Sequence, residues 1–220
     1  MNPYVICTDS ACDMSEAILR DWGVSAASLR FRFEGEPEEY KNNQLSAADF
    51  YQKMRAGGVA KTSAVNVEDF KILFEQYLSN GEDILYLGFS SGISTTYNSA
   101  RLAAEEFDNV LVVDSMSLST GQAMIVLEAC RLAREGADLV TIKTSLEDLV
   151  RKVEISFVLD RLEYMVKGGR CSAAAALGAN LLNLKPCIEV KEGKLQVVKK
   201  YRGSFTKCLQ SYVKDRLAGR

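Results

Sequence analysis

The stretch that decides the fold is Ile84-Leu85-Tyr86-Leu87-Gly88-Phe89-Ser90-Ser91-Gly92-Ile93-Ser94, at residues 84–94. Its apolar first half predicts a buried strand. Its serine-glycine second half predicts a tight turn that leads into a helix over residues 95–107. A strand that passes through a short turn into a helix is a building block of parallel sheets. Ligands of such sheets bind at the carboxyl ends of the strands, so the turn at residues 90–94 is the first candidate site.

The same alternation continues on both sides of this stretch up to about residue 150. Apolar runs predict strands over residues 4–8, 24–33, 84–89 and 110–113. Helical spacing predicts helices that end near Gly23, Ala56, Leu78, Phe107, Gly136 and Val153. Asp13-Met14-Ser15-Glu16 matches a capping box before the first helix. This pattern is typical of an α/β domain with a mainly parallel sheet and flanking helices, which we place at residues 1–150.

Beyond residue 150 the pattern becomes that of a smaller α+β domain, which we place at residues 151–220. The predicted elements are a strand over residues 154–158, an alanine-rich helix over residues 171–182, a hairpin with strands 186–190 and 195–200, and a final helix over residues 205–217. Glu192-Gly193 supplies the turn of the hairpin.

Composition excludes several classes of protein. The 220 residues hold 27 Lys and Arg against 29 Asp and Glu, without a long run of like charge, which argues against nucleic acid or an anionic membrane as the main partner. No stretch is long and apolar enough to span a bilayer, and the first residues lack the pattern of a signal peptide. The six cysteines form no C-x-x-C pair, so we expect reduced thiols in a cytoplasmic protein.

The segment Gly88-Phe89-Ser90-Ser91-Gly92 matches the G-x-S-x-G motif of serine hydrolases. It lies between a strand and a helix, as that motif requires. A serine hydroxyl needs a base to become a nucleophile, and the usual base is a histidine. The chain contains no histidine. A serine hydrolase therefore stays a minor alternative that would need a lysine base.

The same turn could bind an anion without any base. Backbone N–H groups at the start of a helix lack partners, the helix dipole is positive there, and Ser91 and Ser94 add hydroxyl donors. Three interpretations stay open at this point: an anion site, a phosphosugar site of the kind found in sugar isomerase domains, and a simple helix cap provided by Ser94.

Two further groups of polar residues give weaker indications. Thr62-Ser63 comes before the predicted helix that starts near Val67, and a cap is the simplest role for it. If that helix packs beside the strand ending at Phe89, Thr62-Ser63 would face the same crevice as the serine turn. Asp9-Ser10 and Asp114-Ser115 end strands, where turn or capping roles suit them better than a Mg²⁺ site, so we expect no metal.

Basic residues of the C-terminal part form a last group. Lys167-Gly168-Gly169-Arg170, with Arg202 further along, could place two or three cations near a phosphate. Lysines and arginines on a protein surface are mostly solvated. On the motif alone, solvated side chains are therefore favoured over a phosphate site.

Six short motifs occur in this order along the chain: Thr8-Asp9-Ser10, Thr62-Ser63, Ser90-Ser91-Gly92-Ile93-Ser94, Val113-Asp114-Ser115, Lys167-Gly168-Gly169-Arg170 and Leu184-Lys185-Pro186. In residue types and spacing these motifs resemble those of the DegV family, over essentially all 220 residues. Members of that family are two-domain α/β proteins that bind a long-chain fatty acid such as hexadecanoate. Some of them serve as the fatty-acid-binding subunit of bacterial fatty acid kinase.

The resemblance implies that the Thr62 and Ser94 hydroxyls hydrogen-bond the fatty-acid carboxylate, with Ser91 close by. It implies an apolar tunnel between the domains, where each buried CH₂ contributes about 0.8 kcal/mol. In the family an ATP-bound kinase partner converts the carboxylate to an acyl phosphate, which would place Arg170 and Arg202 toward the partner or the incoming phosphate. The chain would then be a monomeric lipid-binding protein that presents a substrate, has no catalytic residues and needs no cofactor besides the fatty acid.

The sequence departs from the family pattern at three points. Ala64-Val65 follows Thr62-Ser63 where the family commonly has Gln-Pro, and Thr95-Thr96 follows Ser94 where the family commonly has glycine. Family chains also continue further, through a glycine-rich segment that includes a histidine near the ligand head group. We therefore expect the C-terminal domain of this chain to be incomplete relative to the family.

Overall fold

The computed structural model describes residues 3–170 and 184–218, and the chain divides into two compact units, Met1–Val153 and Glu154–Arg220. The larger unit contains a four-stranded parallel sheet with strand order β2-β1-β6-β7. Its strands are β1 (Tyr4–Asp9), β2 (Val24–Ala27), β6 (Asp83–Gly88) and β7 (Val110–Asp114). This is the α/β architecture that the sequence predicts. Because the direction of winding reverses between β1 and β6, their carboxyl ends flank the crevice where ligands bind in such sheets.

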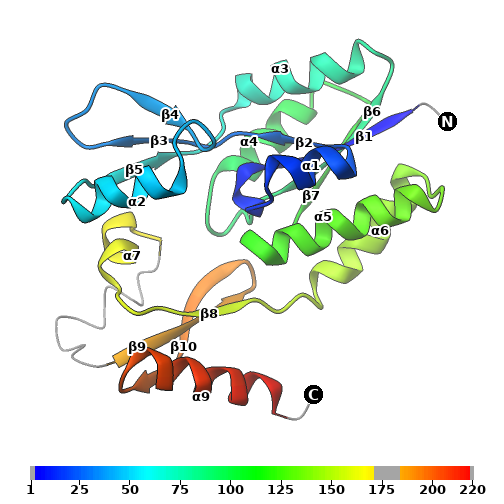
Figure 1. The fold of residues 1–220 in the computed structure, drawn as a ribbon. Coiled ribbons are helices and arrows are strands. Elements are labelled where there is room, and N and C mark those ends of the chain that lie inside the picture. Colours follow the sequence, from blue (N-terminus) through cyan, green and yellow to red (C-terminus); the bar gives the residue numbers. More distant parts are fainter. Residues whose placement is uncertain (1–2, 171–183, 219–220) are drawn as a thin grey trace. The chain divides into compact units, whose positions relative to one another are not determined.

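Helices cover both faces of this sheet (Figure 1). The flanking helices are α1 (Glu16–Trp22), α3 (Val67–Leu78), α4 (Thr96–Ala104), α5 (Ser119–Arg134) and α6 (Leu139–Val150). Successive side chains of a strand point to opposite faces. Ile84 and Tyr86 of β6 accordingly pack in one core with α3 and α4, and Leu85 and Leu87 pack in another with α5 and α6. The apolar run that predicts β6 is thus buried on both sides, as a central parallel strand requires.

The start of α1 differs from the sequence prediction. Ser15 is the N-cap residue, and its Oγ accepts the N–H of Ile18 at 3.3 Å. Asp13 instead has a left-handed backbone, with φ of 55°, and ends a short 3-10 helix, η1 (Ser10–Cys12). The capping box predicted at Asp13 is therefore wrong, because Asp13 ends η1 in a left-handed conformation, whereas an N-cap residue is typically extended.

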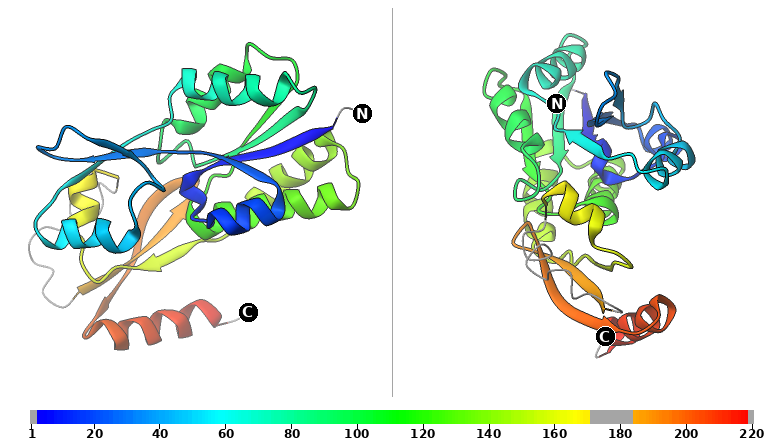
Figure 2. Two further views of the ribbon diagram at one scale, coloured as in Figure 1. Left: turned by 45° about the horizontal axis from the view of Figure 1, so that its top comes forward. Right: turned by 90° about the vertical axis from the view of Figure 1, so that its left-hand side faces the viewer.

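A second, antiparallel sheet in the larger unit has the strand order β4-β3-β5. It consists of β3 (Arg30–Phe33), β4 (Glu39–Lys41) and β5 (Ala60–Ser63), and α2 (Ala47–Arg55) lies between β4 and β5 in sequence. The single strand predicted over residues 24–33 is in fact β2 followed by β3, which carry the chain from one sheet into the other (Figure 2). The Phe31 ring stacks on Tyr40 and meets Phe50 edge-on, with centroids 5.4 and 5.0 Å apart.

The smaller unit is α+β, as predicted. Its antiparallel sheet has the order β10-β9-β8, with β8 (Ser156–Val158), β9 (Leu184–Lys191) and β10 (Lys194–Arg202), and its helices are α7 (Glu163–Gly168) and α9 (Phe205–Leu217). The turn between β9 and β10 has positive φ at both Glu192 and Gly193, which confirms the predicted hairpin. The helix predicted over residues 171–182 lies outside the described residues.

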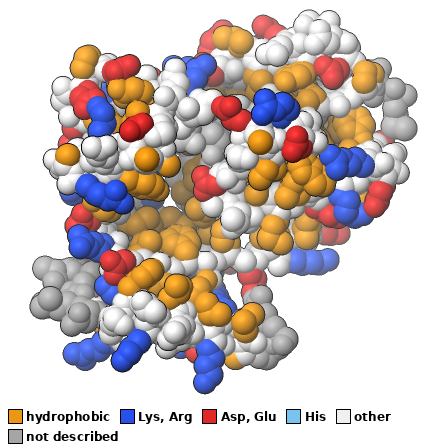
Figure 3. Space-filling view, viewed as in Figure 1, with side chains coloured by type: hydrophobic (Ala, Val, Ile, Leu, Met, Phe, Trp, Pro, Cys, Tyr) orange, Lys and Arg blue, Asp and Glu red, His pale blue; other side chains and the backbone are white. Residues whose placement is uncertain are grey.

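Helix α9 carries both buried and exposed apolar side chains. Cys208 and Tyr212 pack with Tyr201 of β10. Next to this buried pair, apolar side chains that recur every four residues are exposed, and Figure 3 shows hydrophobic side chains along this helix. They are Phe205, Leu209, Val213 and Leu217.

Candidate functional site

Asp9 ends β1 at the switch point of the parallel sheet, and its side chain is fully buried. Oδ1 accepts the N–H of Ala11 at 3.1 Å and Nε2 of Gln122 at 3.2 Å. Oδ2 accepts the hydroxyl of Tyr86 at 2.7 Å and the N–H of Phe89 at 2.8 Å. Burial raises the pKa of Asp9, and these hydrogen bonds oppose that rise because each favours the ionised form. A carboxylate with four donors around it fixes the positions of the loops that follow β1 and β6.

Gln122, in the first turn of α5, extends this buried network. Its Nε2 also lies 3.0 Å from Oγ1 of Thr8, and Thr8 in turn donates to the carbonyl of Leu87 at 2.8 Å. Among the described residues, Oε1 of Gln122 and Oγ of Ser117 are buried without a hydrogen-bond partner. The network therefore joins α5 to the central strands β1 and β6.

The turn after β6 uses its own backbone donors internally. The N–H of Ser90 donates to the carbonyl of Ser117, and the N–H groups of Ile93 and Ser94 donate to the carbonyl of Ser90. The N–H of Gly92 reaches Oγ of Ser90 at 3.3 Å. The expectation of unpaired backbone donors over residues 90–94 is therefore wrong, because the turn closes on itself before the helix begins.

The N–H of Ser91 also has a partner, the carboxylate of Asp114 at the end of β7. Its distances to the two oxygens are 3.2 and 3.3 Å. The same carboxylate accepts the N–H of Met116 at 2.8 Å. Asp114 thus has the turn role predicted for it, and it puts a negative charge beside the serine turn. A phosphate dianion would meet that charge and find these backbone donors occupied.

Ser90, the central residue of the G-x-S-x-G match, is fully buried. A nucleophile elbow requires an exposed hydroxyl at the top of the sheet. The glycine before it has a packing role: a Cβ on Gly88 would lie 2.8 Å from the Tyr86 ring and 2.9 Å from the Tyr97 ring. Close packing of two tyrosines explains the glycine, and the burial of Ser90 argues against a serine hydrolase.

Ser94 acts as a cap for α4 and keeps one side toward the surface. Its Oγ accepts the N–H of Thr96 at 3.2 Å and lies 2.9 Å from Oγ1 of Thr96. The helix begins at Thr96, and Thr95 makes no side-chain cap. Ser91 and Ser94 are both partly exposed. Since the backbone donors of the turn are occupied, the hydroxyls are the groups available to a ligand.

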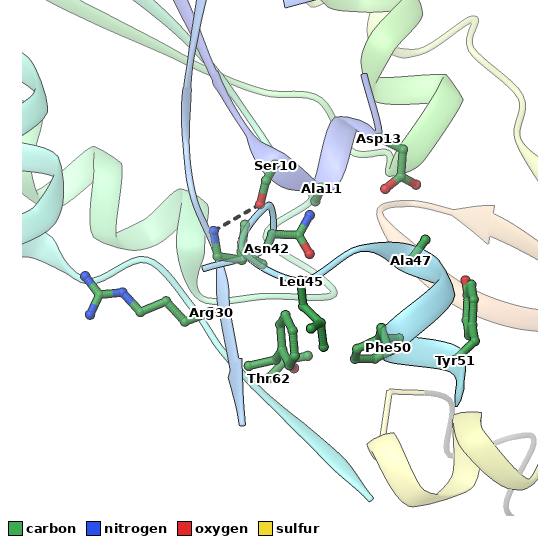
Figure 4. A pocket seen from close by; sticks show the side chains of 12 residues that line it. Ser10, Ala11, Asp13, Arg30, Asn42, Leu45, Ala47, Phe50, Tyr51 and Thr62 are labelled. Carbon is green, nitrogen blue, oxygen red and sulfur yellow. Dashed lines mark hydrogen bonds between the residues drawn. The ribbon is translucent and has the colours of Figure 1, made fainter. Parts of the chain in front are cut away.

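Thr62 lies on β5, directly opposite Phe31 of β3. Opposite residues share one face of a sheet. This face borders a cavity of about 360 Å³, in which Thr62 lies among apolar side chains from three segments (Figure 4). The apolar lining consists of Ala11, Leu29, Phe31, Leu45, Ala47, Phe50 and Tyr51. Small-molecule pockets measure about 300–1,000 Å³, so the cavity has the size of a small site.

The cavity also has a polar side, formed by Ser10, Asp13, Arg30 and Asn42. Oγ of Ser10 accepts the N–H of Leu29 at 3.0 Å, which fastens the loop after β1 to the small sheet (Figure 4). Arg30 makes two contacts of 3.2 Å to the carboxylate of Asp69. The charge of Arg30 is therefore already compensated, and Thr62 is left as an exposed hydroxyl donor in this wall.

The predicted site residues lie on different elements. Thr62 is on β5 and borders the cavity, whereas Ser91 and Ser94 are on the turn after β6 and are not among the described residues that line it. In the smaller unit, Arg170 follows α7 and Arg202 ends β10, and both side chains are exposed. Nη1 of Arg170 donates to the carbonyl of Gly168 at 2.6 Å. The Thr62-Ser63 pair is no cap, since Asn66 caps α3.

Sequence reasoning missed two parts of this site. It assigned Asp9 a turn role, which is correct for the bond to Ala11, but it missed the buried network with Tyr86 and Gln122. It also missed the aromatic wall around Phe31. The network of Asp9 could have been expected from the positions of the strand ends. Asp9 and the serine turn follow adjacent parallel strands and therefore meet at one edge of the sheet.

Fold and site together define an α/β protein with an apolar cavity bordered by the Thr62 hydroxyl and with a serine turn at the carboxyl edge of its parallel sheet. Within residues 3–170 and 184–218, no helix is long and apolar enough to cross a membrane, and no group of three or more His, Cys, Asp or Glu could hold a metal ion.

The chain belongs to the DegV family, whose model, described as an uncharacterised protein family, matches residues 3–215. A DegV domain-containing protein of Clostridium perfringens is 33% identical over 213 residues, which cover 92% of this chain and 72% of that protein. A DegV family protein from Thermus thermophilus, described by its fatty acid binding, has a TM-score of 0.85 and 31% identity over 99% of this chain and 79% of its own. A stearic-acid-binding protein from Eubacterium ventriosum has a TM-score of 0.87 and 27% identity over 97% and 75%.

Proposed function

We propose that this chain binds a long-chain fatty acid, with its carboxylate held by the hydroxyls of Thr62 and Ser94 and with Ser91 close by. The observation that carries the proposal is the exposed Thr62 hydroxyl on the wall of an apolar cavity. Its family relatives of known structure include proteins described as binding fatty acids and stearic acid. A hydroxyl beside apolar side chains suits a ligand that has one small polar end and a long apolar remainder.

The electrostatics of the serine turn favour a carboxylate over a phosphate. Asp114 already occupies the N–H of Ser91, and the amides of Gly92, Ile93 and Ser94 are bonded to Ser90. A carboxylate monoanion that accepts two or three hydrogen bonds from hydroxyl groups needs none of these amides. The phosphate group of a phosphosugar carries about two negative charges, and the Asp114 carboxylate close to it would repel them. These contacts support a fatty acid and count against the phosphosugar alternative.

The chain would present the fatty acid to an ATP-dependent kinase partner. The γ-phosphoryl group of ATP would move to a carboxylate oxygen, giving an acyl phosphate and ADP, with Arg170 and Arg202 facing the partner or the incoming phosphate. Charge supports this assignment: residues 154–220 hold 13 Lys and Arg against 6 Asp and Glu, whereas residues 1–153 hold 14 against 23. The protein would act as a monomer in the cytoplasm, where ATP is available, and would not catalyse the transfer alone.

Mass spectrometry of lipid extracted from the purified chain tests the binding step. We expect a stoichiometric long-chain fatty acid, and we expect the variant Thr62→Ala with Ser94→Ala to lose it. The matched control combines Ser63→Ala with Ser99→Ala, one hydroxyl near each site residue along the chain. The Ser63 hydroxyl bonds to Glu39, and the Ser99 hydroxyl bonds to the Thr95 carbonyl. An extract without fatty acid, together with thermal stabilisation by sugar phosphates, would overturn the proposal. Ester turnover that is lost in Ser90→Ala would instead revive the hydrolase.

The partner step needs a separate test. Arg170→Ala and Arg202→Ala should leave the lipid content unchanged, because both side chains are exposed on the smaller unit. They should slow acyl phosphate formation when the loaded protein is mixed with ATP and the ATP-binding subunit of a fatty acid kinase. Unchanged rates in both variants would remove these arginines from the partner role.

A further inference from the structure

The hydroxyl of Thr96 is fully buried at the first position of α4, and it has one hydrogen-bond partner among the described residues. That partner is Oγ of Ser94, 2.9 Å away. The same Ser94 oxygen accepts the backbone N–H of Thr96 at 3.2 Å. Thr96 therefore contacts the proposed carboxylate donor with both its backbone and its side chain.

The direction of the hydrogen bond between the Ser94 and Thr96 hydroxyls follows from the need of each buried donor for an acceptor. If Ser94 donated to Thr96, the buried proton of Thr96 would have no acceptor, and an unmade bond of a buried donor costs free energy. If Thr96 donates, both lone pairs of the Ser94 oxygen are filled and both buried donors are satisfied. Ser94 is partly exposed, so its own proton is then the group that is left for a partner outside the turn.

We propose that Thr96 is a positioning residue that orients the Ser94 hydroxyl as a donor toward the carboxylate of the bound fatty acid. This inference rests on the proposed function and adds to it the residue that makes Ser94 selective for an ionised head group. The bond from Thr96 also polarises the Ser94 hydroxyl, because a hydroxyl that accepts a hydrogen bond becomes a better donor. Hydrogen bonds to a charged acceptor gain most from this, being roughly twice as strong as neutral ones.

The test compares palmitate with hexadecan-1-ol, which has the same tail and a neutral head group. Thr96→Val keeps the side-chain shape and removes the hydroxyl, so palmitate should bind about tenfold more weakly and the alcohol less than about twofold. Thr96→Ser keeps the hydroxyl and should restore palmitate affinity. Thr95→Val is the matched control, because exposed Thr95 makes no cap and should leave both affinities unchanged.

A double-mutant cycle with Ser94→Ala shows whether Thr96 acts through Ser94. The double variant should bind palmitate no more weakly than Ser94→Ala alone, since the relay is already broken there. An equal loss for acid and alcohol in Thr96→Val, or unchanged palmitate affinity, would overturn the inference while the wild-type chain still bound palmitate. Failure of the wild-type chain to bind palmitate would instead sink the proposed function itself.

Discussion

The hydroxyl of Tyr86 donates a 2.7 Å hydrogen bond to the carboxylate of Asp9, and both side chains are fully buried. The two residues belong to the adjacent central strands β6 and β1 and are 77 positions apart in the chain. Burial, and then the charge of Asp9, raise the pKa of Tyr86 well above its usual value, so Tyr86 stays a donor. This bond and its three companions hold the loops of the candidate site at the edge of the sheet.

Asp9→Asn should lower the free energy of unfolding by about 2–4 kcal/mol, because the amide group would face two donors that lose their acceptor. Tyr86→Phe removes only one of the four donors and should cost about 1–2 kcal/mol. Denaturant unfolding of both variants measures the difference. A smaller loss for Asp9→Asn than for Tyr86→Phe would contradict the assignment of four bonds to the carboxylate.

Gly88→Ala should destabilise the chain by about 1–3 kcal/mol, because the added methyl overlaps the packed rings of Tyr86 and Tyr97. Gly168→Ala is a useful comparison, since a Cβ there would meet nothing within 4 Å. Residue 168 is helical, so that alanine should be neutral or slightly stabilising. Thermal unfolding of the two variants checks this contrast, and equal midpoints would show that Gly88 is not needed for packing.

Ala47→Trp should compete with the ligand, because Ala47 lines the cavity beside Thr62 and the indole would occupy part of its volume. Overfilling costs about 1–3 kcal/mol, so bound fatty acid should fall about tenfold. Ala48→Trp, one position along the same exposed helix start, is the control and should retain the lipid. Quantified fatty acid in extracts of the two variants decides the matter. Equal content would place the acyl chain elsewhere.

The pH dependence of the smaller unit should depend on Asp215. Hydrogen bonds from Lys199 and Tyr201 lower the pKa of Asp215. A carboxyl whose pKa is lower in the folded state stabilises the fold above its unfolded pKa, and this contribution is lost as the pH falls through the lowered value. Thermal unfolding between about pH 6 and pH 3 should therefore show a shallower acid decline in Asp215→Asn than in the wild type. Tyr201→Phe, which removes one of the two donors, should give an intermediate slope, and identical slopes in all three would contradict this account.

The parallel sheet could be predicted from the sequence because its strands are short apolar runs set between helical segments. The small sheet could not, because β4 and β5 are too polar to give a strand pattern: Glu39-Tyr40-Lys41 and Ala60-Lys61-Thr62-Ser63. Their pairing with β3 is decided by contacts between distant segments, which no local pattern contains. Thr62 therefore looked like a residue before a helix when it is a strand residue beside a cavity.

The motif around Ser91 and Ser94, and the family resemblance, pointed to the turn after β6, and the role of these residues in binding stays a prediction. What the structure changes is the set of donors that this turn has to offer. The occupation of the Ser91 amide by Asp114 depends on β6 and β7 being neighbours, with 23 positions between the two residues. The burial of Ser90 likewise depends on what packs above the sheet. Both facts changed the expected donors from backbone amides to hydroxyls.

The pairing of β1 with β6 also determines when the sheet can form as the chain is made. Tyr4 pairs with Asp83, so the first strand must wait until its central partner has been synthesised. Only β2, the neighbour at the sheet edge, is available to it before then. Closing so long a segment lowers the entropy of the chain before the contacts between the strands can stabilise it, and this slows folding. Ribosome-bound chains that end before residue 83 should therefore expose β1 to proteases and chaperones, and protection should begin once β6 has emerged.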